Sequence, residues 1–404
     1  MSTSLLYHAF GIRGHHHTRT DFEGGRVTFH IRRDASTCRC SACGATDVVR
    51  RGEVRRTFRS LPIGRKPTFL ALSIPRVECR RCGVVRQVEI GFADPRRTYT
   101  RALERCILEL GRRMTIRDVA GLLGVGWDLV KDVLKRNLAR RFARPKLKHL
   151  TRIAVDEFAV AGGHRYMTVV LDLDGGAIVF VGDGKAGSAL APFWKRLRPS
   201  GAKIQAVAMD LSAAYRKAVR ENLPKAVIVF DHFHVAKLFN DKLTELRRDL
   251  HREAAGPLQK RVLKGTRWLI LKDPANLDEA KDEKRRLKEA LKLNESLAAA
   301  YYLKEELRWF WRQPGKTFAT RFLDGWLERA RASGVKALQQ MAKTLALHRG
   351  GLLAYYDAMI TSGPLEGTNN KIKTLKRAAY GFRDHEFFKL KLLALHETRY
   401  ELIG

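Results

Sequence analysis

Two acidic residues stand where apolar segments of the sequence end. Asp156 follows residues 153–155 and Asp210 follows residues 204–209, and both segments are typical of buried strands. Carboxylates supply the oxygen ligands that Mg²⁺ and Mn²⁺ prefer. Two such cations held about 3.5 to 4 Å apart can support in-line displacement at a phosphodiester. A single acid at such a place could equally be a strand-end cap or a surface charge, so this interpretation requires a third carboxylate.

Glu366 is the candidate for the third carboxylate. It lies in residues 362–373, where Pro364 suits the first turn of a helix. Polar and basic residues follow it and would form a surface that faces DNA phosphates. These expected DNA contacts are Asn369, Lys371, Lys373, Lys376 and Arg377. Acids are common elsewhere in the helical sequence, so the choice of Glu366 depends on this context.

The segments around the first two acids predict a mixed sheet. Three apolar runs joined by short glycine-containing turns indicate an antiparallel meander, and two further strands each follow a helix. The order of three strands, helix, strand, helix, strand is that of the ribonuclease H-like fold. In that sheet the first and fourth strands are neighbours, so Asp156 and Asp210 would face each other and bridge metal ions. The expected strands are residues 153–158, 166–172, 177–181, 204–210 and 226–231, and the helices are 189–197 and 212–222.

Four cysteines form two pairs with the same spacing. Each pair is Cys-x-x-Cys followed by glycine, a turn that lets both sulfurs reach one metal ion. Strand-like sequence separates the pairs, so the segment is predicted to be a zinc ribbon, although unliganded thiols are the simpler alternative. Cys38 is close enough to replace a neighbouring ligand, and this possibility stays open. The four expected ligands of a structural Zn²⁺ are Cys40, Cys43, Cys79 and Cys82.

Residues 115–134 have the layout of a helix-turn-helix. Thr115 can cap a first helix, Gly124 supplies the turn, and apolar residues recur on one face of each helix. The second helix of such a unit enters the major groove of DNA. A plain helical hairpin is the alternative, and the position between a zinc ribbon and the basic residues 140–148 argues against it. The side chains expected near phosphates are Lys131, Lys135 and Arg136.

A long helical segment separates Asp210 from Glu366, which are 156 residues apart. Residues 236–350 are rich in Leu, Ala, Lys, Arg and Glu, and we expect them to form an all-α domain inserted into the sheet-bearing core. Four of the six tryptophans lie there, at positions 268, 309, 311 and 326. One of them could stack on an unpaired base near a cut, although ordinary core packing is the simpler interpretation.

The net charge points to a polyanionic partner. The 404 residues include 77 Lys and Arg against 42 Asp and Glu, a formal net charge of +35. A compact protein with this excess repels itself unless a polyanion accompanies it, and nucleic acid is the leading choice. Residues 1–150 carry 32 basic and 13 acidic residues, so DNA contact is expected mainly, though not solely, at this end.

The remaining composition excludes other classes of protein. The sequence has no apolar run long enough to span a membrane and no signal-peptide pattern, so no membrane partner is expected. Six cysteines in 404 residues are too few for a disulfide scaffold. A hydrophobic share of 45% is ample for a buried core. We therefore expect a cytoplasmic protein.

Taken together, these motifs resemble the DDE transposases of bacterial insertion sequences, in particular the ISL3 family. The resemblance covers about residues 36–400. The resemblance rests on the zinc ribbon, the helix-turn-helix, the Val-Asp-Glu-Phe segment at 155–158, the Asp-His-Phe-His-Val segment at 231–235 and the segment 366–382. It implies Asp156, Asp210 and Glu366 as the catalytic triad. It also implies an auxiliary role near the active site for Asp231 and His234, with strand-end hydrogen bonding as the alternative for Asp231 and His232.

The activity that this resemblance implies is metal-dependent DNA cleavage and strand transfer, in a bacterial protein associated with the nucleoid. The expected fold is α/β and multidomain, and the implied partners are the terminal inverted repeats, target DNA and further copies of the chain in a dimer or higher oligomer. A DNA-binding regulator without catalysis and a nuclease that cuts without joining are the alternatives. The expected divisions are a β-rich zinc-ribbon region at 1–98, the helix-turn-helix and basic linker at 99–149, the first part of the ribonuclease H-like core at 150–235, the helical insertion at 236–350, and the C-terminal core helices with the catalytic Glu at 351–404.

Overall fold

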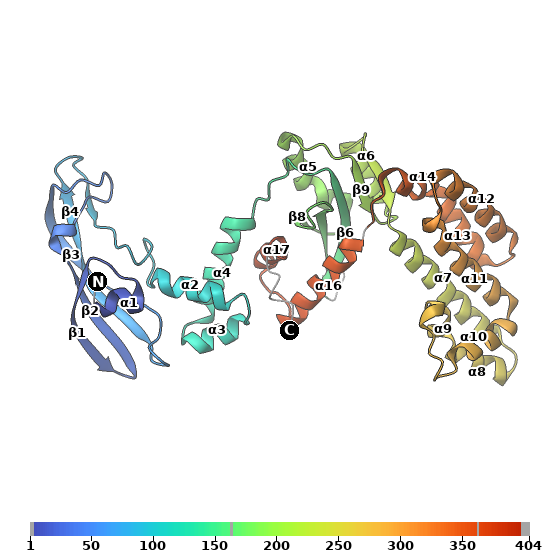
Figure 1. Cartoon of the computed structure of the whole chain (residues 1–404), viewed down its shortest axis with the longest axis horizontal. Coiled ribbons are helices and arrows are strands. Elements are labelled where there is room, and N and C mark those ends of the chain that lie inside the picture. The colour runs from blue at the N-terminus through green and yellow to red at the C-terminus, as the bar shows by residue number, and fades with distance from the viewer. Residues whose placement is uncertain (1–3, 162–164, 362, 397–404) are drawn as a thin grey trace. The chain divides into compact units, whose positions relative to one another are not determined.

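The computed structural model describes residues 4–161, 165–361 and 363–396. The chain divides into two compact units, and Figure 1 labels most of their helices and strands. Unit 1 comprises Met1–Arg144 and Thr374–Gly404, and unit 2 comprises Pro145–Lys373. Among the described residues, no helix combines the length and the apolar character that crossing a membrane requires.

Unit 1 begins with a mixed five-stranded sheet that carries the cysteine pairs. The strand order is β1-β2-β4-β3, and β5 pairs with β4. Gly24 and Gly25 form the two-residue turn between β1 and β2, and their φ values of 56° and 70° suit a tight hairpin. Alternate residues of β2, Val27, Phe29 and Ile31, are buried in the core beneath the sheet. The bounds are α1 (Leu5–Phe10), β1 (His15–Glu23), β2 (Arg26–Arg33), β3 (Val48–Arg59), β4 (Thr68–Cys79) and β5 (Val85–Gln87).

Helices form the second part of unit 1. Thr115 accepts a hydrogen bond from the Asp118 amide at the start of α3, and Gly124 ends that helix with a φ of 58°, as predicted. Helix α17, from near the end of the chain, packs on α4, where Phe387 and Leu390 join its apolar core. No local sequence pattern indicated this packing. The bounds are α2 (Arg101–Leu110), α3 (Ile116–Leu123), α4 (Trp127–Phe142) and α17 (His385–Leu393).

Unit 2 is built on a second five-stranded sheet with the order β10-β9-β6-β7-β8. Strands β6, β7 and β8 form an antiparallel meander, while β9 runs parallel to β6 and β10 parallel to β9. The predicted strand order, with the first strand beside the fourth, is confirmed. The bounds are β6 (Arg152–Ala161), β7 (Arg165–Asp172), β8 (Ile178–Asp183), α5 (Ala191–Leu197), β9 (Ala206–Met209), α6 (Ala213–Asn222) and β10 (Val227–Phe230).

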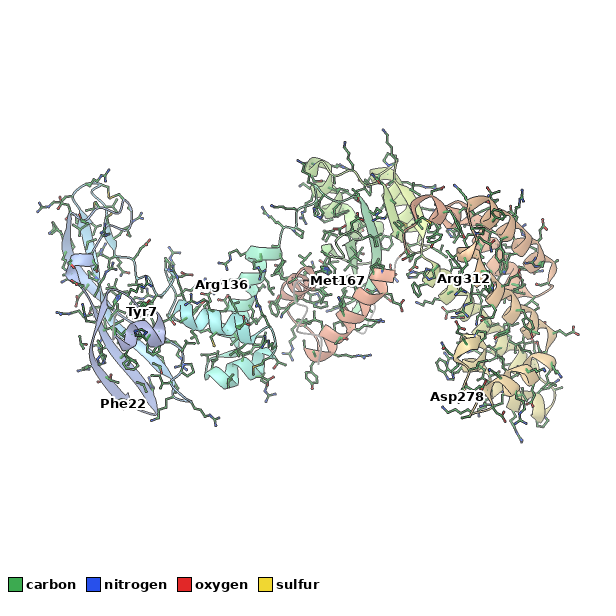
Figure 2. All side chains as sticks on the ribbon, in the orientation of Figure 1. Tyr7, Phe22, Arg136, Met167, Asp278 and Arg312 are labelled. Atoms are coloured by element: carbon green, nitrogen blue, oxygen red, sulfur yellow. The ribbon has the colours of Figure 1, made fainter. Side chains whose placement is uncertain are left out.

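The composition of these strands explains their place in the sheet. All four residues of β9 are buried, as expected for a parallel strand covered on both faces. On β7, Met167 is only 1% exposed, and Figure 2 labels it on the sheet of unit 2. Phe193 and Trp194 of α5 pack into the same core. The sheet is therefore a rigid support for residues at its ends.

The predicted helical region follows β10. Its apolar residues share one continuous core with the sheet, and Trp326 is fully buried there, donating a hydrogen bond of 2.9 Å to the Leu303 carbonyl. The bounds are α7 (His232–Glu253), α8 (Pro257–Gly265), α9 (Arg267–Leu271), α10 (Glu283–Lys292), α11 (Glu295–Leu307), α12 (Lys316–Ala332), α13 (Lys336–Leu347), α14 (Arg349–Leu353), α15 (Tyr355–Ala358) and α16 (Gly363–Ala378). Short 3-10 turns occur at Ala35–Thr37, Gly187–Leu190, Arg198–Ser200, Pro274–Asn276 and Arg308–Arg312.

Helix α14 lies directly against β10. A Cβ atom added at Gly351 would meet the ring of Phe230 at 2.3 Å, so only glycine allows this approach. Phe230 is the last residue of β10 and precedes Asp231. The contact therefore fixes the end of the strand from which α7 begins.

Candidate active site and metal centres

Three aspartates occupy one row across the parallel strands of unit 2. In the strand register Val155 lies beside Met209, and Met209 lies beside Phe230. Parallel neighbours are about 4.8 Å apart, so the residues that follow them lie side by side across the sheet. Strands β9 and β10 end at this row, whereas β6 continues to Ala161, so the predicted strand end at its acids is wrong for β6. Those next residues are Asp156, Asp210 and Asp231.

Asp156 is buried and held from two sides. One carboxylate oxygen accepts a hydrogen bond of 2.7 Å from the Asn369 side chain, and the other accepts one of 2.8 Å from the Glu157 amide. Burial raises the pKa of Asp156, and the nearby charge of Asp210 raises it further, against the lowering effect of these hydrogen bonds. The ionised carboxylate is thus under-compensated by the protein around it.

A second acid beside Asp156 was not singled out by the sequence. Burial raises the pKa of Glu157, and the charges of Asp210 and Asp156 add to that shift. Glu157 hydrogen bonds with the Tyr215 hydroxyl, which lies 2.8 Å from the hydroxyl of Thr168 on β7. The only available signal was the adjacency of two acids in the Val-Asp-Glu-Phe segment.

His234 lies in the first turn of α7 between two aspartates. Its Nδ1 is 2.9 Å from Asp231 Oδ2, and its Nε2 is 3.9 Å from Asp156 Oδ1. The hydrogen bond with Asp231 raises the pKa of His234, as do the charges of Asp156 and Asp210, although burial lowers it. Asp231 in turn caps α7 by accepting a 2.9 Å hydrogen bond from the Phe233 amide. Of the two predicted auxiliary residues, His234 therefore lies beside Asp156, and Asp231 contacts His234.

Glu366 lies in the first turn of α16, and its side chain is exposed. Burial lowers the pKa of His232, and the charges of Asp231 and Glu366 act in the opposite direction. His232 Nδ1 is 3.7 Å from Asp231 Oδ1, so Glu366 interacts with a residue at the edge of the sheet where the aspartates emerge. One turn further along α16, Asn369 reaches Asp156 directly.

This acidic site fits a divalent cation by charge. Within the described residues, only the cysteine set brings three or more ligand atoms within 4.8 Å of one another, so the carboxylates form no closed cluster. Asp156 and Glu157 nevertheless have raised pKa values caused partly by neighbouring acids. The buried Oδ1 of Asn369 has no hydrogen-bond partner. A cation would relieve the repulsion between the acids and offer that oxygen a partner.

The four predicted cysteines come together in unit 1. Their Sγ atoms all lie within 4.8 Å, with 3.7 Å between Cys40 and Cys82 and 3.5 Å between Cys43 and Cys79. A tetrahedral zinc with bonds of about 2.3 Å has sulfur–sulfur edges of about 3.8 Å, so the cluster fits a structural zinc. Cys38 is buried in the apolar core and is outside the cluster, which settles the alternative raised by its position.

The cations predicted to contact DNA from α4 are engaged within unit 1. The Nζ atoms of Lys131 and Lys135 lie 2.9 and 3.0 Å from Asp384 Oδ2. Arg136, labelled on α4 in Figure 2, hydrogen bonds with the Tyr99 hydroxyl and with Glu104. A DNA phosphate would have to compete with Asp384 for both lysines. The sequence offered no signal for this pair, because Lys135 and Asp384 are 249 residues apart.

The other candidates fall into different environments. Asn369, predicted as a DNA contact, donates a hydrogen bond to Asp156, and its contact with DNA stays a prediction. Trp268 and Trp309 of the helical region are 66% and 56% exposed, whereas Trp311 packs against the core and lies 5.7 Å from the His232 ring. Lys371, Lys373 and Arg377 of α16 are exposed, and Lys376 is partly buried.

Comparison with known proteins covers both units. A zinc-finger model of the transposases IS204, IS1001, IS1096 and IS1165 matches residues 36–82, and a helix-turn-helix model of transposase family ISL3 matches residues 88–136. The transposase model of the ISL3 DDE family matches residues 153–392, more than half of the chain.

Individual relatives agree with these models. The chain is 33% identical to the transposase for insertion sequence element IS1001 of Bordetella parapertussis over 92% of each protein. It is 29% identical to the transposase for insertion sequence element IS1557 of Mycobacterium tuberculosis, over 95% of this chain and 91% of the relative. A solved Drosophila P element transposase strand transfer complex overlaps with 75% of this chain and 92% of that one at a TM-score of 0.39 and 11% identity, too low to carry weight. The family models and the IS1001 relative show that the chain belongs to the ISL3 family of DDE transposases.

Proposed function

We propose that this transposase cuts and joins DNA at the ends of a bacterial insertion sequence, with Asp156, Asp210 and Glu366 as its catalytic carboxylates. The row formed by Asp156 within β6, Asp210 just after β9 and Asp231 just after β10 is the observation that carries the proposal. The under-compensated charge of Asp156 and the contact of Asn369 from α16 support it.

The three carboxylates would hold Mg²⁺ or Mn²⁺, which prefer oxygen ligands. Such ions, when bound, lower the pKa of an attacking water or hydroxyl and stabilise the leaving oxygen. The protein's own share is orientation: Asn369 holds one oxygen of Asp156, and His234 lies between Asp156 and Asp231. Water would cleave at the element's end, and the freed 3′-hydroxyl would then attack another phosphodiester, with no covalent intermediate on the protein.

Unit 1 would recognise the terminal inverted repeats. Zinc held by the four cysteines would stabilise the ribbon, and the helix-turn-helix would enter the major groove. Cations of α4 and α16 would contact phosphates, with Lys131 and Lys135 exchanging Asp384 for DNA. Pairing of two ends would require a dimer or higher oligomer, and the substrate places the enzyme at the bacterial nucleoid.

Purified variants test the assignment of the triad. A labelled duplex of the element's end is incubated with Mg²⁺ and wild-type, Asp156→Asn or Glu366→Gln protein. Both variants should bind the duplex normally and lose cleavage. Glu328→Gln, at an exposed acid of α12, is the matched control and should cut normally.

Each other outcome has a definite meaning. Full activity of Asp156→Asn or Glu366→Gln would refute the triad. Cutting by the wild type without transfer to a target duplex would identify a nuclease. Tight binding without any cutting would identify a DNA-binding regulator.

A further inference from the structure

Tyr380 has an unusual position just beyond the end of α16. Its side chain is 99% exposed, the highest value among the exposed large apolar or aromatic residues. Its backbone is left-handed, with a φ of 50°. The Tyr380 amide donates to the Arg377 carbonyl and the Gly381 amide donates to the Lys376 carbonyl, both at 3.0 Å. This pair of hydrogen bonds defines a Schellman motif, in which glycine normally occupies the place of Tyr380.

A tyrosine at this position does not serve the stability of the fold. The left-handed conformation is unfavourable for a residue with a Cβ atom, and glycine would adopt it without strain. An almost fully exposed ring contributes no core packing. A strained and exposed aromatic residue is therefore better explained by something that it contacts outside the protein.

The turn that carries Tyr380 is firmly anchored. Phe382, two residues later, stacks on Phe388 with ring centroids 4.6 Å apart and packs against the core of unit 1. Asp384 then caps α17 and pairs with Lys131 and Lys135 of α4. The ring is thus presented on a rigid element of the unit that carries the helix-turn-helix, which lowers the entropy lost on binding.

The charge around Tyr380 identifies the partner as a polyanion. No acidic residue occurs between Glu366 and Asp384. Glu366, Lys373 and Arg377 share one exposed stripe of α16, since they are spaced seven and four residues apart. This stripe leads from the first turn toward the turn that bears Tyr380. The five cations of this segment are Lys371, Lys373, Lys376, Arg377 and Arg383.

We infer that Tyr380 is a DNA-contacting residue whose ring stacks on a base of the bound element end while the cations beside it contact the phosphates. The inference rests on the proposed binding of that DNA. An aromatic side chain among basic residues is the combination with which proteins bind unstacked bases, because every base offers a face to the ring. Such a contact opens or kinks the DNA at one step, as inserted side chains do elsewhere.

Substitution at Tyr380 separates this role from a structural one. Tyr380→Gly removes the ring and relieves the backbone strain, so its Tm should be no lower than that of the wild type. Its affinity for the element's end should fall by about 5- to 150-fold, the range for one base stacked on an aromatic ring. Tyr380→Trp should restore most of the affinity.

Met359→Gly is the matched control. Met359 is also left-handed, with a φ of 49°, and 68% exposed at the end of a helix. Its replacement by glycine relieves the same kind of backbone strain and removes an exposed side chain that is not part of the basic residues 371–383. Binding of the element's end should be unchanged in this variant.

Photo-crosslinking locates the contact. Duplexes of the element's end carry 5-iodouracil at one position at a time and are irradiated with full-length protein. Wild type should crosslink at one or two adjacent positions through the peptide that contains Tyr380, and Tyr380→Gly should lose that product. These readouts need no cleavage, so a wild type that crosslinks without cutting would refute the proposed chemistry and leave the contact intact.

Three results would overturn the inference. The first is wild-type affinity and crosslinking in Tyr380→Gly. The second is a lower Tm for that variant, which would make the residue structural. The third is loss of self-association in sedimentation with DNA binding retained, which would assign the ring to a second copy of the chain.

Discussion

At the scale of single residues, the candidate site is a group of acids in a strongly basic protein. Asp156 is buried and lies near Asp210, and it accepts hydrogen bonds from the Asn369 side chain and from the Glu157 amide, with His234 3.9 Å away. A cation would stabilise the charged form of this buried carboxylate. The carboxylate must keep one orientation to bind that cation. Asn369 provides that orientation from another helix, as groups that hold metal ligands in place commonly do.

Replacing Asn369 tests whether it positions Asp156 or binds DNA. Asn369→Ala should lower the rate of cleavage at saturating DNA by about 10- to 100-fold, the usual effect of losing a group that holds a metal ligand. The affinity for DNA should stay within about twofold, since an interaction felt only in the reaction step does not alter binding. Asn369→Asp should be more damaging, because it would place a second negative charge beside Asp156. A loss of affinity with an unchanged saturated rate would show that Asn369 contacts DNA instead.

At the scale of elements, two tight contacts hold the pieces that carry the site. Helix α14 touches the end of β10 through Gly351 and Phe230. Helix α17 is joined to α4 by an apolar core and by Asp384, which accepts from the Phe387 amide and pairs with two lysines. Each contact can be changed by one substitution.

Adjacent glycines of α14 provide a matched pair. Gly351→Ala should force Phe230 to move and destabilise unit 2 by about 1–3 kcal/mol, the usual cost of overpacking. Gly350→Ala meets nothing within 4 Å and should stabilise the helix by about 0.5–1 kcal/mol. Thermal unfolding measures both. Equal effects of the two substitutions would show that the contact with β10 has no energetic weight.

Asp384 should make the stability of unit 1 depend on pH. Burial alone would raise the pKa of Asp384, but the Phe387 amide and the ammonium groups of Lys131 and Lys135 outweigh it and lower the pKa below its usual range. A lowered pKa stabilises the fold above the unfolded value of about 3.9 and ceases to do so as the pH falls through the folded value. Asp384→Asn should therefore cost about 1–3 kcal/mol at pH 7 and progressively less below about pH 4.

The measurement is the difference in Tm between Asp384→Asn and wild type across that pH range. Glu386→Gln, at an exposed acid two residues further on, is the control and should show little difference at any pH. A constant difference between pH 7 and pH 3 would contradict the assignment of the pKa shift to Asp384.

At the scale of the whole molecule, the protein combines an excess of positive charge with a group of acids in unit 2 and a cluster of cysteines in unit 1. The formal charge of +35 favours a polyanion throughout. The cysteine cluster joins the turns that precede β3 and follow β4, so its metal links parts of the chain that are far apart in sequence. Binding and folding at this end are therefore expected to depend on the metal.

Removal of zinc should weaken recognition of the element's end and leave the catalytic unit 2 folded. A chelator, or Cys43→Ser, should destabilise the sheet of unit 1 and weaken binding of the element's end, because zinc affinity contributes directly to folding. The fold of unit 2 should persist, as reported by the buried Trp326. Cys106→Ser, outside the cluster, is the control. Undiminished thermal stability and DNA binding after complete zinc removal would refute a structural zinc.

Salt should weaken DNA binding steeply, since each phosphate contact releases counterions. Replacing Lys373 and Arg377 by glutamine should make the slope of log K against log salt shallower by about one for each. Lys284→Gln, where the lysine already pairs with Glu279, should leave the slope unchanged. An unchanged slope in the glutamine variants of Lys373 and Arg377 would show that these residues of α16 do not contact DNA phosphates.

Local patterns allowed much of this protein to be predicted. Apolar runs before Asp156 and Asp210 predicted the strands and the end of β9, because burial and strand alternation depend on near neighbours. They did not predict that β6 continues past Asp156 to Ala161. The Thr115 cap and the left-handed Gly124 followed from the chemistry of helix ends. The cysteine pairs predicted a four-sulfur cluster, because tetrahedral ligation restricts the spacing within each pair.

Only the tertiary structure decided which distant side chains meet. The amide of Asn369 reaches Asp156 across 213 residues of sequence, and Lys135 meets Asp384 across 249. The neighbouring sequence does not identify these partners, because the chain contains many similar lysines and acids. Only the folded arrangement brings these particular side chains into contact. The exposure of Tyr380 was equally hidden, since an aromatic residue after an amphipathic helix is as compatible with a core as with solvent. The sequence by itself determined the elements and their chemistry, and the packing of those elements decided which charges are paired within the protein and which stay exposed.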